Sequence, residues 1–260
     1  MSRGCNCGAG GCISIDRILG KLDEHLNKND YSAAEKHLLY WLGEAEAGGD
    51  HRTELLMRNE LMGLYRKLGK EEEALRSVSI ALNRIEELNI SEQVGSATTF
   101  LNCATVYKAF GGAEKSIPLF ERARAIYEKE LNPNDSRLGG LFNNMGLALV
   151  DLGRFSEAKE LYGKAIAVME SQEDGDLEVA ITYLNIASAL EAELGLADAD
   201  EEIQGFMDKS ESILESHENK DGYYAFVCEK CASVFGYYGR FIYEDQLTQR
   251  AEEIYRNARS

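Results

Sequence analysis

Five of the six cysteines lie in two short motifs whose thiols could bind a metal ion or exchange a disulfide. Cys5, Cys7 and Cys12 lie in a glycine-rich N-terminal stretch, where three thiolates could hold a soft metal. The alternative is a flexible tail without a role, which the lack of helical periodicity favours. Cys228 and Cys231 form a Cys-x-x-Cys motif, but they fall on the apolar face of a predicted helix, without the second ligand pair of a zinc site. We therefore expect this pair to pack in the protein core.

The other residue types that support catalysis are not spaced for it. None of the four histidines forms a His-x-x-x-His or Glu-x-x-His pair on one helix face. The sequence also lacks a Gly-x-Ser-x-Gly motif and a glycine-rich phosphate loop after a strand. We therefore predict that the protein is not an enzyme and uses no cofactor or metal ion. A metal- or redox-handling role for the N-terminal cysteines is the weakest alternative.

Asparagines recur at a regular spacing that could serve binding. Asn102, Asn144 and Asn185 are separated by about one repeat each, and every side-chain amide offers both donors and an acceptor. A row of such amides could pair with the backbone of an extended peptide. The alternative is that they bridge neighbouring repeats or cap helices, and the sequence does not decide between the two.

The elements that position these asparagines repeat along the chain. Residues 142–149 (FNNMGLAL) align with residues 100–107 (FLNCATVY) at an offset of 42 residues. Each copy has apolar residues at the i, i+3, i+4, i+7 spacing of a helix, then a glycine, then a second helix with small and large residues in register. Six copies align on the residue near the centre of the first helix: Leu22, Met62, Ala104, Gly146, Ala187 and Ala232. We therefore predict an array of stacked two-helix units.

This pattern resembles the tetratricopeptide repeat. Gly146, Gly153, Ala158, Tyr162 and Ala165 match the small, glycine and aromatic positions of that family. The 42-residue period and the Asn-Asn pair before the small residue are similar to the kinesin light chain subtype. The resemblance implies an all-α fold, a right-handed superhelical solenoid of about six helix-turn-helix repeats. We expect a flexible tail over residues 1–13 and one solenoid over residues 14–260, with repeats near residues 15–48, 55–90, 97–131, 139–172, 180–216 and 225–258.

The resemblance also implies where a partner would bind. In this family the first helix of each repeat lines a concave groove, and asparagines there contact peptide main chains. The groove residues that we predict on this basis are Asn59, Arg66, Lys67, Asn102, Lys108, Asn143, Asn144 and Asn185. The equivalent positions in the sixth copy are Lys230 and Tyr237. The basic side chains could attract a carboxylate, although a base on a helix is often only solvated.

Composition narrows the class of partner. The formal net charge of −17, from 45 acidic and 28 basic residues, makes the chain a poor candidate for binding nucleic acid. No apolar run approaches the ~20 residues of a membrane helix, and no signal peptide is recognisable, so we expect a cytoplasmic protein. The predicted function is a scaffold or adaptor that binds a peptide or protein segment. The alternative is a ligand- or peptide-responsive regulator that acts through a partner.

The C-terminal repeat is rich in aromatic residues. By register, Tyr223, Tyr237 and Tyr238 could be exposed, and tyrosine is well suited to binding surfaces. We expect these residues to cap the end of the array or to mediate a homodimer. Contact with a ligand is the less favoured alternative.

Overall fold

The computed structural model describes residues 14–259, which form twelve helices and no strand. The predicted tail with Cys5, Cys7 and Cys12 lies outside the described residues. The helices are α1 (Ile15–Asn27), α2 (Tyr31–Gly48), α3 (His51–Leu68), α4 (Glu71–Glu87), α5 (Val94–Ala109), α6 (Ala113–Glu130), α7 (Ser136–Asp151), α8 (Phe155–Met169), α9 (Asp176–Leu194), α10 (Leu196–Ser216), α11 (Gly222–Tyr237) and α12 (Phe241–Arg259). Each odd-numbered helix packs on the even-numbered helix that follows it. The prediction of an all-α solenoid of two-helix repeats is confirmed.

Local sequence determines where the helices begin and end. The Asp50 carboxylate accepts a hydrogen bond from the backbone N–H of Thr53 at 3.1 Å, which caps the first turn of α3. Gly69 follows α3 with a φ of 67°, and Gly153 follows α7 with a φ of 70°. Glycine adopts this left-handed conformation without strain and so allows the chain to leave the helix.

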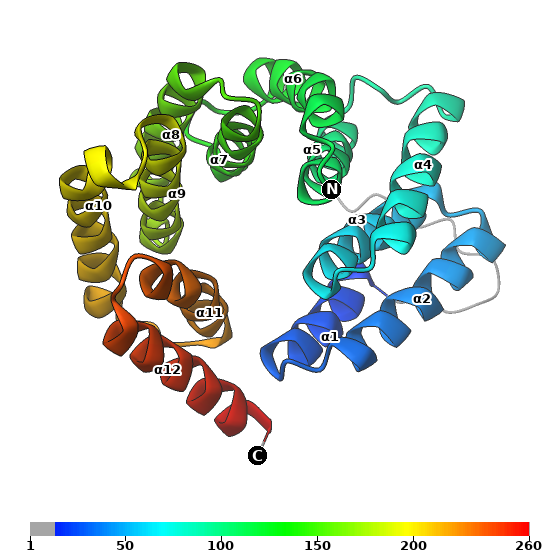
Figure 1. Cartoon of the computed structure of the whole chain (residues 1–260). Coiled ribbons are helices and arrows are strands. Elements are labelled where there is room, and N and C mark those ends of the chain that lie inside the picture. Colours follow the sequence, from blue (N-terminus) through cyan, green and yellow to red (C-terminus); the bar gives the residue numbers. More distant parts are fainter. Residues whose placement is uncertain (1–13, 260) are drawn as a thin grey trace.

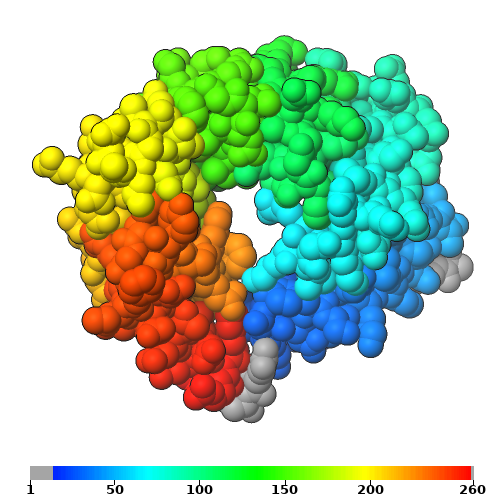
Figure 2. Space-filling model, viewed as in Figure 1, coloured from blue at the N-terminus to red at the C-terminus, as the bar shows by residue number. Residues whose placement is uncertain are grey.

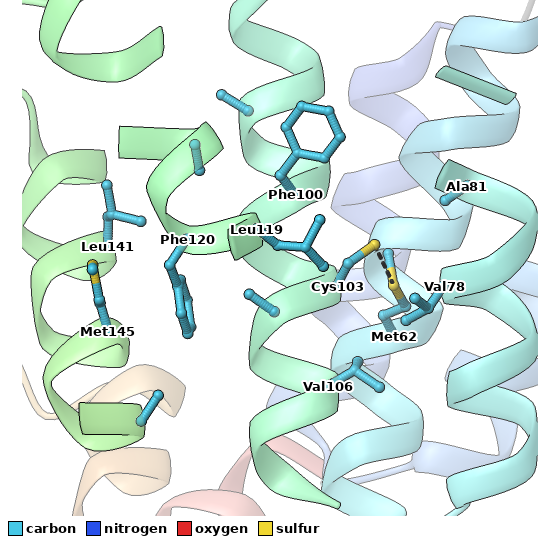
Figure 3. Close-up of a cluster of buried hydrophobic side chains, with 14 of the residues drawn as sticks. Met62, Val78, Ala81, Phe100, Cys103, Val106, Leu119, Phe120, Leu141 and Met145 are labelled. Atoms are coloured by element: carbon cyan, nitrogen blue, oxygen red, sulfur yellow. Dashed lines mark hydrogen bonds between the residues drawn. The ribbon is translucent and has the colours of Figure 1, made fainter. Parts of the chain in front are cut away.

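The small residues of the repeat pattern allow the two helices of a pair to approach closely. A Cβ atom on Gly146 of α7 would lie 2.6 Å from Cε1 of Tyr162 of α8, so that ring occupies the space of the missing side chain. Figure 3 shows the packing between repeats, where Cys103 of α5 faces Met62 of α3 with their sulfur atoms 3.8 Å apart. Both side chains are fully buried. The interior is therefore continuous from one repeat to the next.

The buried apolar side chains of the described chain form two clusters. The first is built mainly from α1 to α8, and the second from α9 to α12. Ala189 of α9 belongs to the first cluster, and Ile186 of α9 packs against both. Helix α9 therefore joins the two parts of the core.

The six helix pairs curve round a central opening. Figure 1 shows the odd-numbered helices on the inside of the curve, and Figure 2 shows an open hollow in the middle of this face. The curvature brings the last pair back to the first, so that α11 contacts α1. The described chain thus forms a closed ring, and its inner helices surround a lumen.

Candidate peptide-binding groove

The inner helices carry all eight side chains that the sequence places in the groove. Asn59, Arg66 and Lys67 lie on α3, while Asn102 and Lys108 lie on α5. The remaining residues are Asn143 and Asn144 on α7 and Asn185 on α9. Some of these side chains bond within the protein, the Asn102 amide does not, and the basic side chains differ in their ion-pair partners.

Several of the asparagines make hydrogen bonds within the protein. The Asn185 amide donates to Asn143 Oδ1 at 2.9 Å and so links α9 to α7. The Asn59 amide donates to Thr99 Oγ1 at 3.1 Å and links α3 to α5. Asn144 donates to the backbone carbonyl of its own helix, at Gly140, at 2.8 Å. These bonds stabilise the stacking of the repeats and the inner helix α7.

Asn102 differs from the other asparagines. Its side chain on α5 is half-buried, and its amide makes no hydrogen bond with any residue in the described part of the chain. Both donor and acceptor groups are therefore available to a ligand. The row that is regular in sequence is thus irregular in its hydrogen bonding.

Three cationic side chains, Arg66, Lys108 and Lys230, come from three separate inner helices. Arg66 of α3 has solvent-exposed surface. The protein around its guanidinium removes part of its hydration, which lowers the pKa of this group. Lys108 of α5 is half-buried and lies 3.5 Å from a carboxylate oxygen of Asp151 on α7. Burial lowers the pKa of Lys230 on α11, the Glu178 carboxylate opposes this effect, and the charges of Arg66 and Lys108 add to the lowering. The charges of Arg66 and Lys108 therefore both act on Lys230.

The inner helices also carry carboxylates that the sequence analysis did not single out. Glu60 of α3 is half-buried, and burial together with the Asp23 charge raises its pKa. Glu178 of α9 accepts a hydrogen bond from the Tyr223 hydroxyl. Glu60 lies two residues before the anchor Met62, the register position of Asn102, so its inward position could have been predicted from the repeat. Glu178 is identified only by its contacts.

Lys67 has a different environment from the other bases. Its ammonium lies 3.3 Å from a carboxylate oxygen of Glu229 on α11, and its side chain is only one-third exposed. It also lies 4.7 Å from the ring centroid of Tyr31 and 4.8 Å from that of Phe226. These contacts hold it between the first and last repeats.

The Cys-x-x-Cys motif lies in the second hydrophobic cluster. Cys228 and Cys231 are buried, and burial raises the pKa of their thiols to about 11 and about 12. Both groups are therefore protonated at neutral pH, whereas a metal ligand is a thiolate. Within residues 14–259 no three Cys, His, Asp or Glu side chains are grouped to hold a metal ion.

Most of the C-terminal aromatic residues make contacts within the chain. The Tyr237 and Tyr238 hydroxyls donate to the two oxygens of Glu191, at 2.6 and 2.8 Å, and so join α11 to α9. Phe241 and Ile242, at the start of α12, are 65% and 78% exposed. A homodimer through this repeat stays a prediction.

Comparison with known proteins identifies the repeat. Residues 53–129 and 140–171 match family models of the tetratricopeptide repeat. These two segments are tetratricopeptide repeats. The resemblance to the kinesin light chain subtype is also confirmed. The kinesin light chain-related protein 3 of Arabidopsis thaliana is 26% identical over 111 residues, 42% of this chain but 17% of that protein. The match thus spans less than a fifth of the curated relative's length.

Solved structures share the fold of these tetratricopeptide repeats. BtubC (BKLC) from P. vanneervenii superposes with a TM-score of 0.62 at 18% identity, over 79% of this chain and 82% of that chain. A Rap protein complexed with Competence and Sporulation Factor superposes with a TM-score of 0.60 at 15% identity, over 95% and 66%. Tetratricopeptide repeat proteins generally act as protein-binding scaffolds. Among the described helices, none combines the length and apolar character needed to cross a membrane.

Proposed function

We propose that this protein is a non-enzymatic scaffold or adaptor whose inner helices bind an extended peptide or protein segment carrying an acidic group. The supporting observation is that Arg66, Lys108 and Lys230 come from three inner helices and that the charges of Arg66 and Lys108 both act on Lys230. A carboxylate between them would relieve the mutual repulsion of the three charges. It would also accept charge-assisted hydrogen bonds, which are about twice as strong as neutral ones.

The charge of the whole molecule makes this local arrangement selective. At a net charge of −17, most of the surface repels an acidic partner. Arg66 forms no ion pair with a carboxylate in the described chain, so it is available to an incoming anion. An acidic segment is therefore attracted to the lumen rather than to the outer helices.

Recognition of the peptide backbone rests first on Asn102, whose amide is unoccupied. Asn144 and Asn185 each use one amide hydrogen within the protein, at Gly140 and Asn143. Each retains a second hydrogen and the carbonyl oxygen for a ligand. Asn59 and Asn143 serve mainly to link neighbouring repeats in this proposal.

A displayed library of random peptides tests the proposal directly. We expect selected peptides to be enriched in Asp and Glu, and to bind Arg66→Gln and Lys230→Gln at least about tenfold more weakly, since a hydrogen bond to a charged group contributes about 1.5–3 kcal/mol. Lys129→Gln is the matched control, because Lys129 is exposed on the outer helix α6. Fluorescence anisotropy of a labelled selected peptide gives the affinities.

The same peptide tests the role of the asparagine. Asn102→Ala is expected to weaken binding while helicity and thermal stability stay unchanged. Selected peptides without acidic enrichment, or equal affinities for all the variants, would contradict the proposal. A regulatory role through a partner stays a prediction that no contact in the described chain favours.

A further inference from the structure

The contact that closes the ring joins parts of the chain that are far apart in sequence. Lys67 and Glu229 are separated by 162 residues, yet their charged groups lie 3.3 Å apart. Tyr31 of the first repeat and Phe226 of the last both face the Lys67 ammonium. Gly222, at the start of α11, lies against Asn27 at the end of α1. The first two repeats therefore meet the last one through a separate interface.

This interface differs from those between successive repeats. Successive repeats share fully buried side chains such as Met62 and Cys103. At the closing contact, the Lys67 and Glu229 side chains are 33% and 36% exposed, and Phe226 is 36% exposed. The two hydrophobic clusters meet at Ile186 of α9, not at this junction. The charged and cation–π contacts of the junction are thus partly hydrated, and contacts of this kind stabilise weakly and are screened by salt.

We propose that these contacts form a reversible latch, defined as Tyr31, Lys67, Phe226 and Glu229, that lets the protein alternate between a closed ring and an open arc. The remaining interfaces of the array have buried cores and stay intact when the latch opens. Raising the ionic strength weakens the ion pair and favours the open arc.

The latch has a consequence for access to the lumen, and this consequence rests on the proposed function. A closed ring admits a peptide that has a free end, which can thread through the opening. An internal segment with a folded domain on either side enters only when the first and last repeats separate. The latch would then determine how fast such a partner binds.

Disulfide trapping measures the latch without any ligand. A Cβ atom built on Gly222 would lie 3.3 Å from Asn27 Cβ, close to the about 3.5–4.5 Å span of a disulfide. Asn27→Cys and Gly222→Cys are combined in a background in which Cys5, Cys7 and Cys12 are replaced by Ser. The rate of disulfide formation at fixed oxidant then reports the closed population. Salt can also change the reactivity of a thiol by itself. This effect is measured separately by reacting each single-cysteine variant with a thiol reagent at each salt concentration.

We expect the disulfide to form readily at low salt and more slowly, by up to about threefold, when Lys67→Met removes the charge, because a weak, partly exposed ion pair changes the closed-to-open ratio by about that factor. In 1 M salt, where the Debye length falls to about 3 Å, the rate should fall similarly. Lys129→Met is the control and should not alter it. A rate that neither Lys67→Met nor salt changes, or a pair that does not form, would overturn the latch.

Small-angle X-ray scattering provides a second measurement. The reduced double-cysteine protein should expand as salt rises, whereas the oxidised form should keep one radius of gyration, with helicity by circular dichroism unchanged in both. An equal radius in the reduced protein at all salt concentrations would contradict the proposal. Because neither experiment uses a peptide, the latch and the peptide-binding function can fail independently.

Discussion

The carboxylate of Glu54 joins three cationic or ionisable side chains on two helices. It is 1% exposed and lies 3.2 Å from Nε of Arg58, 3.1 Å from Nε of Arg84 and 3.3 Å from Nδ1 of His51. Burial by itself would raise the pKa of Glu54, but hydrogen bonds from His51, Arg84 and Arg58 outweigh it and lower the pKa. The ionised form is therefore the one that the fold stabilises.

Glu54→Gln is expected to lower the free energy of unfolding by about 1.5–3 kcal/mol at pH 7, because it removes a buried anion that accepts hydrogen bonds from two arginines, which keep only Glu46 and Glu87. A group with a lowered folded pKa stabilises the protein above its unfolded pKa, near 4.5, and loses that effect as the pH falls through the folded value. Urea unfolding of both proteins from pH 7 to about pH 3 should show their difference shrinking. A difference that is constant with pH would contradict this electrostatic role.

For single residues of the candidate site, the sequence predicts the helix on which they lie but not their hydrogen-bond partners. Asn102 and Asn185 occupy the same register position, yet one amide is unoccupied and the other bonds to Asn143. The repeat pattern predicts that both lie on an inner helix, because helical periodicity is local. It does not predict their partners, because these depend on the neighbouring repeat, where a second asparagine at position 143 is available only to Asn185.

At the scale of the helices, the repeat pattern was informative because every position of it has a local physical cause. Gly146 is small because Tyr162 packs against it, and glycines such as Gly69 and Gly153 adopt the positive φ needed just after a first helix. Helix type and order therefore follow from the sequence. Longer-range features, such as the division of the core at α9, depend on how whole faces pack and have no short pattern.

Two glycines within one helix pair should respond to alanine in opposite ways. Gly153→Ala should destabilise the protein by about 1–2 kcal/mol, because its φ of 70° places Cβ against the following carbonyl. Gly163→Ala in α8 should stabilise it by about 0.5–1 kcal/mol, because that position is helical and nothing lies within 4 Å of the new Cβ. Urea midpoints followed by circular dichroism measure both. Changes of the same sign would contradict this account of the turn.

At the scale of the whole molecule, the two hydrophobic clusters predict two units of local stability. Amide protection should change in level between α8 and α9, because the first cluster draws mainly on α1 to α8 and the second on α9 to α12. Hydrogen exchange followed by mass spectrometry resolves these segments. Uniform protection from α7 through α10 would show that the array instead opens as one unit.

Ring closure is the feature that no part of the sequence predicts. It results from the small rotation between successive repeats, summed over six helix pairs. The repeat pattern predicts Lys67 as a groove residue and does not single out Glu229, and only the curvature of the whole array brings the two together. The electrostatic environment of the lumen has the same origin, since Lys230 reaches Arg66 and Lys108 only in a closed ring.

Closure of the ring also imposes an order on biosynthesis. Each helix pair packs mainly on its sequence neighbours, so the early repeats can fold while the ribosome is still adding the later ones. Glu229 is 162 residues beyond Lys67, so the ring can close only after the repeats between them have been made. During translation the lumen is open on one side. A chain already lying along the inner helices at that stage would be encircled when the last repeat meets the first two, without any end having to thread through.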